Sequence, residues 1–428
     1  MKEEQCNKPF SISKYAVYDA WKEVKKNRGS AGIDAVSIKE YEQELGKYLY
    51  KLWNRMSSGT YFPQPVKLVE IPKKNGGKRP LGIPTVNDRI AQSVVVLHIN
   101  ERLDKEFHNH SYAYRSGRSA IDALSTARQR CWKYDWVLDM DISKFFDTID
   151  HDLLMRAVRR HVTEKWILLY IERWLKVPYE TTQGERIERT MGVPQGSVIG
   201  PVLANLFMHY VFDKWMKIHY PHIPFERYAD DTICHCRTQK EAETMKVIIM
   251  NRLTECKLRL NEEKTRIVYC KDSSRKDKQE NISFDFLGYT FRPRKTKNSK
   301  NGTIFTGFLP GISQKSKNHI HETIRSWQLK RKKDFTAMDV QMSASVRGWI
   351  NYYGKFSQSI LKSTLQALNH AIVRWALRKY KRFKGSLKRA WQWLIGRYQK
   401  NPQLFYHWCR GIIPCYFKLK PAKIRRAV

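Results

Sequence analysis

Several features that define other protein classes are absent from this sequence. The 428-residue chain has no run approaching roughly eighteen consecutive apolar residues, so no membrane-spanning helix is expected. Its first residues lack the apolar segment of a secretory signal peptide. The eight cysteines form no Cys-x-x-Cys pair, which indicates neither a disulfide framework nor a zinc knuckle. Together these absences predict a cytoplasmic protein with reduced thiols and no membrane partner.

Acidic residues are scarce in the last third of the chain. The whole sequence carries 79 Lys+Arg against 41 Asp+Glu, but the stretch from Phe291 to the C-terminus carries 31 against 3. Tryptophans are interspersed among these basic residues: Trp327, Trp349, Trp375, Trp391, Trp393 and Trp408. Basic residues neutralise phosphates, whereas indoles stack on bases or build a local core, so the composition favours nucleic acid over an anionic membrane. A solvated basic surface is the alternative interpretation.

The remaining composition and its periodicity predict a folded α+β protein. With 42% hydrophobic and 12% aromatic residues, the chain has enough apolar material for a core. Residues 66–72 and 79–84 flank an Asn-Gly-Gly turn and predict a β-hairpin. Strands and helices interleave over residues 134–290 without a regular βαβ rhythm, which is typical of an α+β, palm-like sheet. A basic connector is expected over residues 291–313, followed by helices over residues 314–428.

Two pairs of aspartates occupy expected strand positions. Residues 134–142 alternate as a strand does, which places Asp139 and Asp141 on one face. Asp230 and Asp231 lie between apolar stretches and are expected at the tip of a hairpin. Carboxylates from two separate strands form an oxygen-rich site that suits two magnesium ions. Such a site in a basic protein predicts a phosphoryl or nucleotidyl transferase, and spacing alone does not separate a nuclease from a polymerase.

Eight sequence blocks occur in an order shared with one enzyme family. They occupy residues 71–73 with 79–84, then 114–120, 141–147, 192–205, 228–231, 260–265, 286–289 and 347–353. The block at 228–231 reads YADD, and the last reads RGWINYY. In these blocks the chain resembles the reverse transcriptases, and most closely the group II intron-encoded reverse transcriptase/maturases.

The resemblance implies the fold and the domain order. It predicts an α+β right-hand polymerase with fingers and an antiparallel palm sheet, followed by an all-α thumb/maturase region. Residues 1–133 would form the N-terminal extension and fingers, and residues 134–290 the palm with interleaved fingers helices. Residues 291–313 would be the connector, and residues 314–428 the helical thumb/maturase and basic C-terminal region.

The resemblance also implies the catalytic residues. Asp141, Asp230 and Asp231 are expected to hold two Mg²⁺ ions, for which Mn²⁺ can substitute, with the backbone carbonyl of Ile142 as a further ligand. Adjacent strand side chains point to opposite faces, so Asp230 and Asp231 are not equivalent unless the turn redirects one, and Asp230 is preferred. Asp139 is expected to support the sheet or a neighbouring arginine.

Five residues are expected at the incoming nucleotide: Lys73, Arg79, Phe146, Gln195 and Lys264. Lys73 and Arg79 would neutralise the triphosphate. Phe146 would pack under the sugar and exclude a ribose 2′-hydroxyl. Gln195 would hydrogen-bond near the nucleotide, and Lys264 would act as a general acid toward the pyrophosphate leaving group.

Nine basic residues are expected to bind nucleic acid: Arg115, Arg118, Arg347, Lys379, Lys381, Arg382, Lys384, Lys388 and Arg389. The last six of these, hereafter the basic cluster, are the densest group of charges in the tail. The expected partners are an RNA template with a DNA primer, dNTPs and a structured RNA. The predicted function is RNA-directed DNA polymerisation together with binding of intron RNA to assist splicing and mobility.

Three details depart from the family pattern or invite another interpretation. Gly200 stands where the family usually has Ser, and a zinc-ligand-rich endonuclease domain is not expected after residue 411. Cys234, His235 and Cys236 could suggest a metal site, but a strand would place the two cysteines opposite the histidine, which favours packing.

Two other functions stay open: a reverse transcriptase recruited to phage defence with a small RNA template, and a splicing-only RNA-binding maturase. The intact aspartate set argues against the second.

Overall fold

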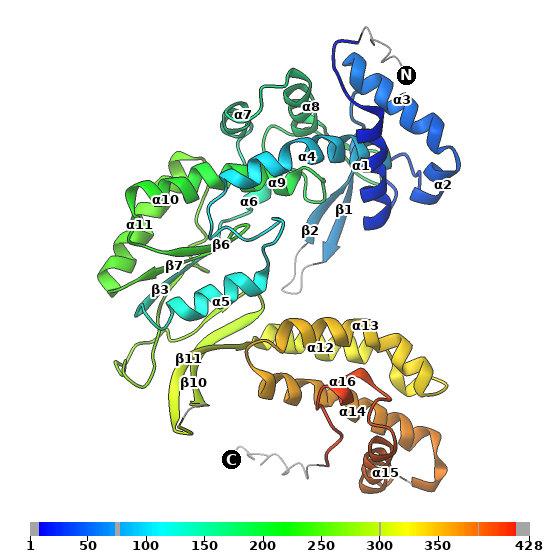
Figure 1. Cartoon of the computed structure of the whole chain (residues 1–428), viewed down its shortest axis with the longest axis vertical. Helices are drawn as coiled ribbons and strands as arrows, with labels where there is room; N and C mark the ends of the chain where they lie inside the picture. The colour runs from blue at the N-terminus through cyan, green and yellow to red at the C-terminus, as the bar shows by residue number, and fades with distance from the viewer. Residues whose placement is uncertain (1–7, 73–77, 299–300, 384, 417–428) are drawn as a thin grey trace. The chain divides into compact units, whose positions relative to one another are not determined.

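The chain forms two compact units, Met1–Tyr269 and Cys270–Val428. Figure 1 shows the computed structural model, which describes residues 8–72, 78–298, 301–383 and 385–416. Across those ranges no helix combines the length and the apolar character that a membrane span requires.

The first unit begins with helices that pack around one long helix, α4 (Val86–Glu106). They are α1 (Lys14–Asn27), α2 (Ile38–Gln43) and α3 (Leu45–Ser58). Ser13 caps α1, and Ser37 forms a capping box with Glu40 at the start of α2, so local sequence sets where these helices begin. Eleven residues of α4 are buried, and this helix is the centre of the packing.

The predicted hairpin is confirmed by the pairing of β1 (Val66–Pro72) with β2 (Lys78–Ile83). The small strands β4 (Tyr179–Glu180) and β5 (Arg186–Ile187) extend this sheet, and β4 pairs in parallel with β1. The turn residues 73–77, Lys73 among them, lie outside the described residues.

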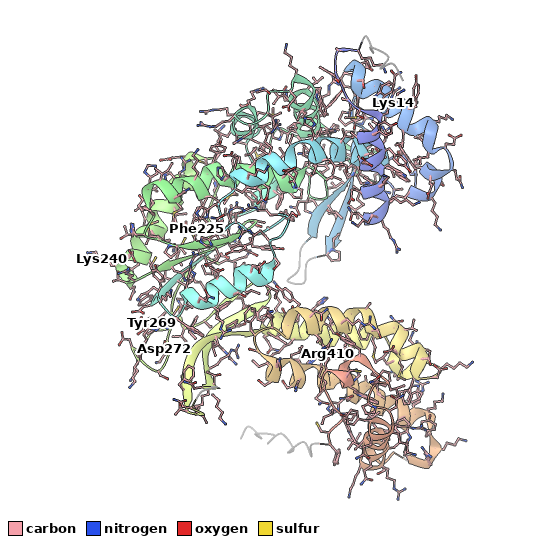
Figure 2. All side chains as sticks on the ribbon, viewed as in Figure 1. Lys14, Phe225, Lys240, Tyr269, Asp272 and Arg410 are labelled. Carbon is pink, nitrogen blue, oxygen red and sulfur yellow. The ribbon has the colours of Figure 1, made fainter. Side chains whose placement is uncertain are left out.

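The antiparallel palm sheet is also confirmed. Its order is β6 (Phe225–Tyr228), β7 (Asp231–Cys236), β3 (Trp136–Met140) and β8 (Arg266–Tyr269), and every neighbouring pair is antiparallel. Phe225 and Tyr269 belong to the two edge strands (Figure 2). Helix α11 (Gln239–Glu255) packs on β3, β7 and β8, while α5 (Ala120–Arg130) contacts β6.

The other helices of this unit interleave with the palm strands. They are α6 (Phe145–Thr148), α7 (His151–Arg159), α8 (Lys165–Lys176), α9 (Gly200–Met208), the π-helix η1 (His209–Asp213) and α10 (Lys214–His219). The fold is therefore α+β, as predicted.

The second unit starts with a β-sheet where the sequence suggested a connector. Strands β9 (Phe284–Phe286), β10 (Tyr289–Lys297) and β11 (Ile304–Ile312) pair antiparallel in the order β11-β10-β9. Phe291 is buried and stacks on Phe284 at 4.8 Å, whereas Arg292 next to it is exposed. The four basic residues of β10 are exposed or partly buried, and the buried residues of this strand are Tyr289 and Phe291. A stretch with the composition of a linker therefore pairs as a strand along its whole length. The division between units consequently follows Tyr269 instead of residue 290.

Beyond residue 314 the chain is helical, as predicted. Its elements are α12 (Gln314–Ser326), the 3₁₀ turn η2 (Leu329–Arg331), α13 (Phe335–Tyr353), α14 (Gln358–Lys379), the 3₁₀ turn η3 (Lys381–Phe383), α15 (Leu387–Lys400) and α16 (Tyr406–Cys409). Trp375, Trp391 and Trp408 are buried in a separate hydrophobic core, so these indoles build the unit. Trp327 and Trp349 are partly buried and stack on each other at 5.5 Å.

Candidate active site

Asp230 and Asp231 lie at a tight hairpin, as predicted. Tyr228 pairs with Asp231, which leaves Ala229 and Asp230 as the two turn residues between β6 and β7. Ala229 has φ 59°, a left-handed conformation that is uncommon for a residue with a side chain. Asp230 is half-buried and Asp231 is exposed, so the turn gives the two carboxylates different surroundings. This difference fits the prediction that they are not equivalent.

The sheet register brings Asp141 to the same edge. The last pair between β3 and β7 is Met140 with Thr232. Asp141 follows Met140, and Asp231 precedes Thr232, so on antiparallel strands the two aspartates are the next residues beyond the same end of the pairing. Asp141 therefore lies at the same end of the palm sheet as the turn that carries Asp230 and Asp231, although 89 residues separate Asp141 from Asp230.

The backbone carbonyl of Ile142 is not used by its neighbouring bridge. Ile142 bridges Leu260, but the hydrogen bonds run from Ser143 N–H to the Arg259 carbonyl at 2.9 Å and from Asn261 N–H to the Asp141 carbonyl at 2.8 Å. Ile142 thus occupies the non-hydrogen-bonded position of this antiparallel pair. The predicted backbone ligand is consistent with this pattern.

Among the described residues, Lys264 places its ammonium group at Asp141. Its Nζ donates to Asp141 Oδ2 at 3.0 Å, and the lysine side chain is 65% exposed. The possible metal ligands at this edge are carboxylate and carbonyl oxygens, which suit Mg²⁺. The ion pair with Lys264 places a positive charge beside Asp141. No group of three or more His, Cys, Asp or Glu side chains with metal-binding proximity occurs in the described part of the chain.

Arg227 is a site residue that sequence reasoning missed. Its guanidinium is fully buried and binds both oxygens of buried Asp213, at 2.7 and 2.6 Å. It also donates to Ser111 Oγ at 2.7 Å, to Asn205 Oδ1 at 3.1 Å and to the carbonyl of Ala229 at 3.0 Å. The last bond holds the aspartate turn itself. A usable signal was present, because an arginine in an apolar strand must be paired to be tolerated.

A second buried chain of polar groups supports the same strands. Glu226 is fully buried between Arg130, with which it forms an ion pair, and His235, whose Nε2 lies 2.6 Å from Glu226 Oε2. Arg130 also contacts His110 Nε2 at 2.7 Å. Burial, helped by the Arg130 charge, lowers the pKa of His110 to about 4, so this imidazole is neutral at pH 7.

Cys234 and Cys236 take part in packing, as predicted. Both are buried in the core on the face opposite His235, and burial raises the pKa of the Cys236 thiol to about 12. Neutral buried thiols are poor metal ligands, which supports the packing interpretation.

The fingers hairpin and the 192–197 loop meet at the residues predicted for nucleotide binding. Gly82 N–H, on β2, donates to the Gln195 carbonyl at 2.8 Å. Gly196 has φ 108°, and a Cβ there would collide with the Gly82 carbonyl, so only glycine permits this approach. The Gln195 amide donates to Asp147 Oδ1 at 3.2 Å. Arg79 belongs to β2, but its side chain lies outside what the structure describes.

Phe146 differs from its neighbour in exposure. Phe145 is buried, whereas Phe146 is only partly buried and meets the Phe145 ring edge-on at 5.2 Å. The Phe146 carbonyl accepts from Val193 N–H at 2.7 Å, which fixes the short helix α6 to the 192–197 loop. An aromatic ring that is held but not enclosed suits the predicted contact with a sugar.

Replacing Phe146 by Val should relax sugar discrimination. The smaller side chain removes the expected clash with a 2′-hydroxyl, so ribonucleotide incorporation should rise by about 10-fold or more, with a smaller loss for deoxynucleotides. The measurement is the ratio of kcat/KM for dNTP and rNTP on one primed RNA template. Phe145→Leu, in the adjacent buried position, serves as the packing control. An unchanged ratio in Phe146→Val would place this ring in the core.

The prediction for Arg115 is wrong. Its side chain is 5% exposed and ion-paired with Asp104 at 2.7 Å, and it donates to the carbonyls of His108 and Ser111. Because its N–H donors already bind these acceptors, the Arg115 guanidinium holds its loop against α4 and is not available to a phosphate. Arg118 is exposed, with Asn109 Oδ1 at 3.5 Å, and stays a predicted contact.

The predicted basic residues of the second unit are at its surface. Arg347 is exposed on α13 and lies over the Tyr406 ring at 5.1 Å. The described members of the basic cluster are exposed at the end of α14, in η3 and at the start of α15: Lys379, Lys381, Arg382, Lys388 and Arg389. Lys379 donates to the Lys333 carbonyl, and Lys384 lies outside the described residues.

Comparisons with known proteins identify the class. The family "Reverse transcriptase (RNA-dependent DNA polymerase)" matches residues 71–291, about half of the chain. Asp141, Asp230 and Asp231 lie within the matched residues. The chain therefore belongs to the reverse transcriptase family, whose members generally use divalent metal ions.

The second match places the chain more closely. The family "Group II intron, maturase-specific domain" matches residues 317–393. LtrA, a group II intron-encoded protein of Lactococcus lactis, is 26% identical over 444 residues, covering 82% of this chain and 70% of LtrA. The chain is a group II intron-encoded reverse transcriptase/maturase, an RNA-directed DNA polymerase that acts in intron splicing and mobility.

Two other relatives extend the comparison. Protein YkfC of Escherichia coli K12 is 30% identical over 302 residues, covering 62% of this chain and 76% of that protein. The putative COX1/OXI3 intron 1 protein of Saccharomyces cerevisiae is 33% identical over 170 residues, but these are 40% of this chain and only 20% of the yeast protein. The similarity to the yeast protein thus concerns one part of it.

Proposed function

We propose that this chain extends a DNA primer on an RNA template with two Mg²⁺ ions held by Asp141, Asp230, Asp231 and the carbonyl of Ile142. The observation that carries the proposal is the sheet register, which sets Asp141 beside the hairpin that bears Asp230 and Asp231. Bound metal ions would supply charge neutralisation for the attacking and leaving oxygens.

The surrounding residues of the chain have their own proposed tasks. Lys264 carries a proton on Nζ beside Asp141 and would deliver it to the departing pyrophosphate. Gln195, fixed by the Gly82 contact, would orient the nucleotide, and Phe146 would bound the sugar. Arg79 would neutralise the triphosphate from β2.

The second unit is the proposed contact for structured RNA. It is strongly basic, and its described basic cluster is exposed with few neighbouring acids. A-form duplexes offer phosphates and 2′-hydroxyls but little readable sequence, so recognition would depend mostly on shape and charge. The maturase-specific match and the complete aspartate set favour this role over phage defence or splicing without polymerisation. Seven free cysteines in the described residues fit the proposed cytoplasmic location.

Neutralising the basic cluster should weaken RNA binding and flatten its salt dependence. In a variant with all six residues changed to Gln, each lost phosphate contact should reduce the log–log salt slope by about 0.7 to 0.9. The measurement is filter binding to a group II intron transcript across a KCl titration, with a thermal melt to verify folding. A folded variant with parental affinity and slope would move the RNA site elsewhere.

A pull-down tests the biological partner directly. The native protein is isolated from its own cells, and the co-purified RNA is sequenced and supplied as template. An enriched group II intron RNA, with primer extension on an RNA template, supports the proposal. A different small RNA as the dominant species would contradict the intron assignment.

A further inference from the structure

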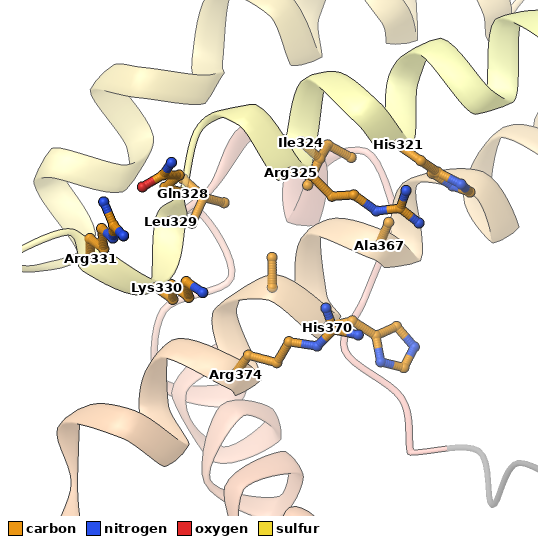
Figure 3. Close-up of a pocket in the computed structure, with 11 residues that line it drawn as sticks. His321, Ile324, Arg325, Gln328, Leu329, Lys330, Arg331, Ala367, His370 and Arg374 are labelled. Atoms are coloured by element: carbon orange, nitrogen blue, oxygen red, sulfur yellow. The ribbon is translucent and has the colours of Figure 1, made fainter.

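A basic pocket lies within the helical part of the second unit. It has a volume of about 580 Å³ and is formed by α12, η2 and α14. Figure 3 shows Arg325 on α12 and Arg374 on α14, whose side chains enter the space between the two helices. Pockets of roughly 300 to 1,000 Å³ accept small organic molecules, so this one is large enough for a nucleotide.

Among the described residues that line the pocket, none is a carboxylate and four are cations: Arg325, Lys330, Arg331 and Arg374. Within the described residues none of these four side chains forms an ion pair or a hydrogen bond. The chain has only three acidic residues after position 290, and none of them lines the pocket. All four side chains are exposed. Like charges around one pocket repel one another when no acid pairs with them, and a bound anion relieves that repulsion. The pocket is therefore an anion site by charge.

A phosphate alone would leave much of the pocket unused. Its floor contains buried Ile324 and Leu329, and Ala367 and Ala371 face the space from α14. Small and apolar side chains suit a flat ring more than an ion, because a base buries apolar faces and an ion does not. The lining thus combines an apolar surface with a cationic rim.

Two histidines add polar groups at the pocket wall. His321 Nε2 lies 3.1 Å from the Thr364 carbonyl, which ties α12 to α14. The His370 ring meets Trp391 edge-on at 4.9 Å. Burial, and then the Arg374 charge, lowers the pKa of His370, so this imidazole is neutral at pH 7 and can donate or accept a hydrogen bond.

The backbone between α12 and η2 shapes the rim. Gln328 adopts φ 46° and ψ 44°, a left-handed conformation that is uncommon for a residue with a side chain. This turn ends α12 and starts η2, which carries Lys330 and Arg331 to the pocket. Gln328 itself lines the pocket, and left-handed conformations of residues other than glycine are enriched at functional sites.

We propose that this pocket captures one unpaired nucleotide of the bound RNA, with its phosphate against Arg325 and Arg374 and its base against Ala367 and Ala371. The proposal rests on the proposed RNA-binding role of this unit. Sequence-specific contacts to RNA favour bulged or looped nucleotides, whose bases can leave the stack, and a group II intron offers many. An acidic peptide would satisfy the cations but not the apolar floor.

The test uses the full-length protein and two fluorescent RNA hairpins that differ by one bulged adenosine. The parent should bind the bulged hairpin about tenfold tighter, the size of one base-stacking contact. Ala371→Leu fills the floor without changing charge, and the double variant Arg325→Gln/Arg374→Gln removes the rim. Both should bind the two hairpins equally. Lys315→Gln/Lys400→Gln, which removes the same charge outside the pocket, should keep the preference.

The outcomes distinguish nucleotide capture by this pocket from general RNA binding by the second unit. If the parent shows no preference, or if Ala371→Leu keeps it, nucleotide capture is overturned. If the rim variant and its control weaken both hairpins alike, the pocket is only a part of a charged surface, which also overturns the inference. Primer extension on an RNA template and binding of an intron transcript test the proposed function separately, because neither needs the bulge. Thermal melts establish that each variant is folded.

Discussion

Replacing Asp141 or Asp230 by Asn should lower primer extension on an RNA template by several orders of magnitude. The substitution keeps the side-chain volume but removes a negative oxygen ligand, so the charge that develops on the transferred phosphate loses its neutralising partner. The measurement is single-turnover extension with Mg²⁺ at saturating dNTP, which reports the chemical step. Binding of structured RNA should persist, because the basic cluster belongs to the other unit.

A matched control exists on β3, the strand that leads to Asp141. Asp139 lies two residues before Asp141 and is still within the paired strand, opposite Ile233 and Arg266, whereas Asp141 lies beyond the last pair. Asp139→Asn should therefore retain most of the extension rate. Extension at a near-parental rate by Asp141→Asn or Asp230→Asn would show that the catalytic carboxylates are wrongly assigned.

The strands and the hairpins were predictable because their signals are local. Residues 66–84 carry alternation and an Asn-Gly-Gly turn within a single short stretch, and the structure has the hairpin there. The aspartate turn is predicted by the same reasoning, since Tyr228 and Asp231 pair across two residues. A short-range pattern needs no knowledge of the rest of the fold.

Composition failed where a single pattern fits two structures. The basic residues of β10 suggest a linker by composition, but the strand pairs with β11 along its whole length, and Phe291 is buried against Phe284. Arg115 lies in a loop that suits RNA binding, yet its partner Asp104 lies eleven residues earlier on α4. Whether an arginine meets a phosphate or a carboxylate depends on tertiary distances that sequence spacing does not contain.

Arg227 shows the same limit at the active site. Its three side-chain partners come from two segments: Ser111 from a loop, and Asn205 and Asp213 from the continuous helical stretch of α9 and η1. Nothing in the sequence indicates that this helical stretch and the loop with Ser111 converge on one guanidinium. The family blocks predicted the turn at residues 228–231 but not the buried group that holds it.

Arg227→Met should destabilise the protein and slow catalysis. Removing one partner leaves Asp213 buried and unpaired, which costs about 3 to 5 kcal/mol of folding free energy. The turn also loses the bond to the Ala229 carbonyl, and a small displacement of a catalytic group can lower kcat about 10²-fold. We expect kcat to fall while the KM for dNTP changes little, because the nucleotide contacts lie elsewhere.

A double variant separates positioning from stability. Arg227→Met/Asp213→Leu removes both charges and fills the space with apolar groups, which often restores stability because no buried charge stays unpaired. Urea unfolding should therefore show the double variant to be more stable than Arg227→Met alone, while its kcat stays low because the Ala229 carbonyl still lacks its donor. Recovery of both stability and kcat would mean that Arg227 only maintains the fold. Recovery of stability without kcat would make Arg227 a positioning residue, acting on the aspartates through the turn that carries them.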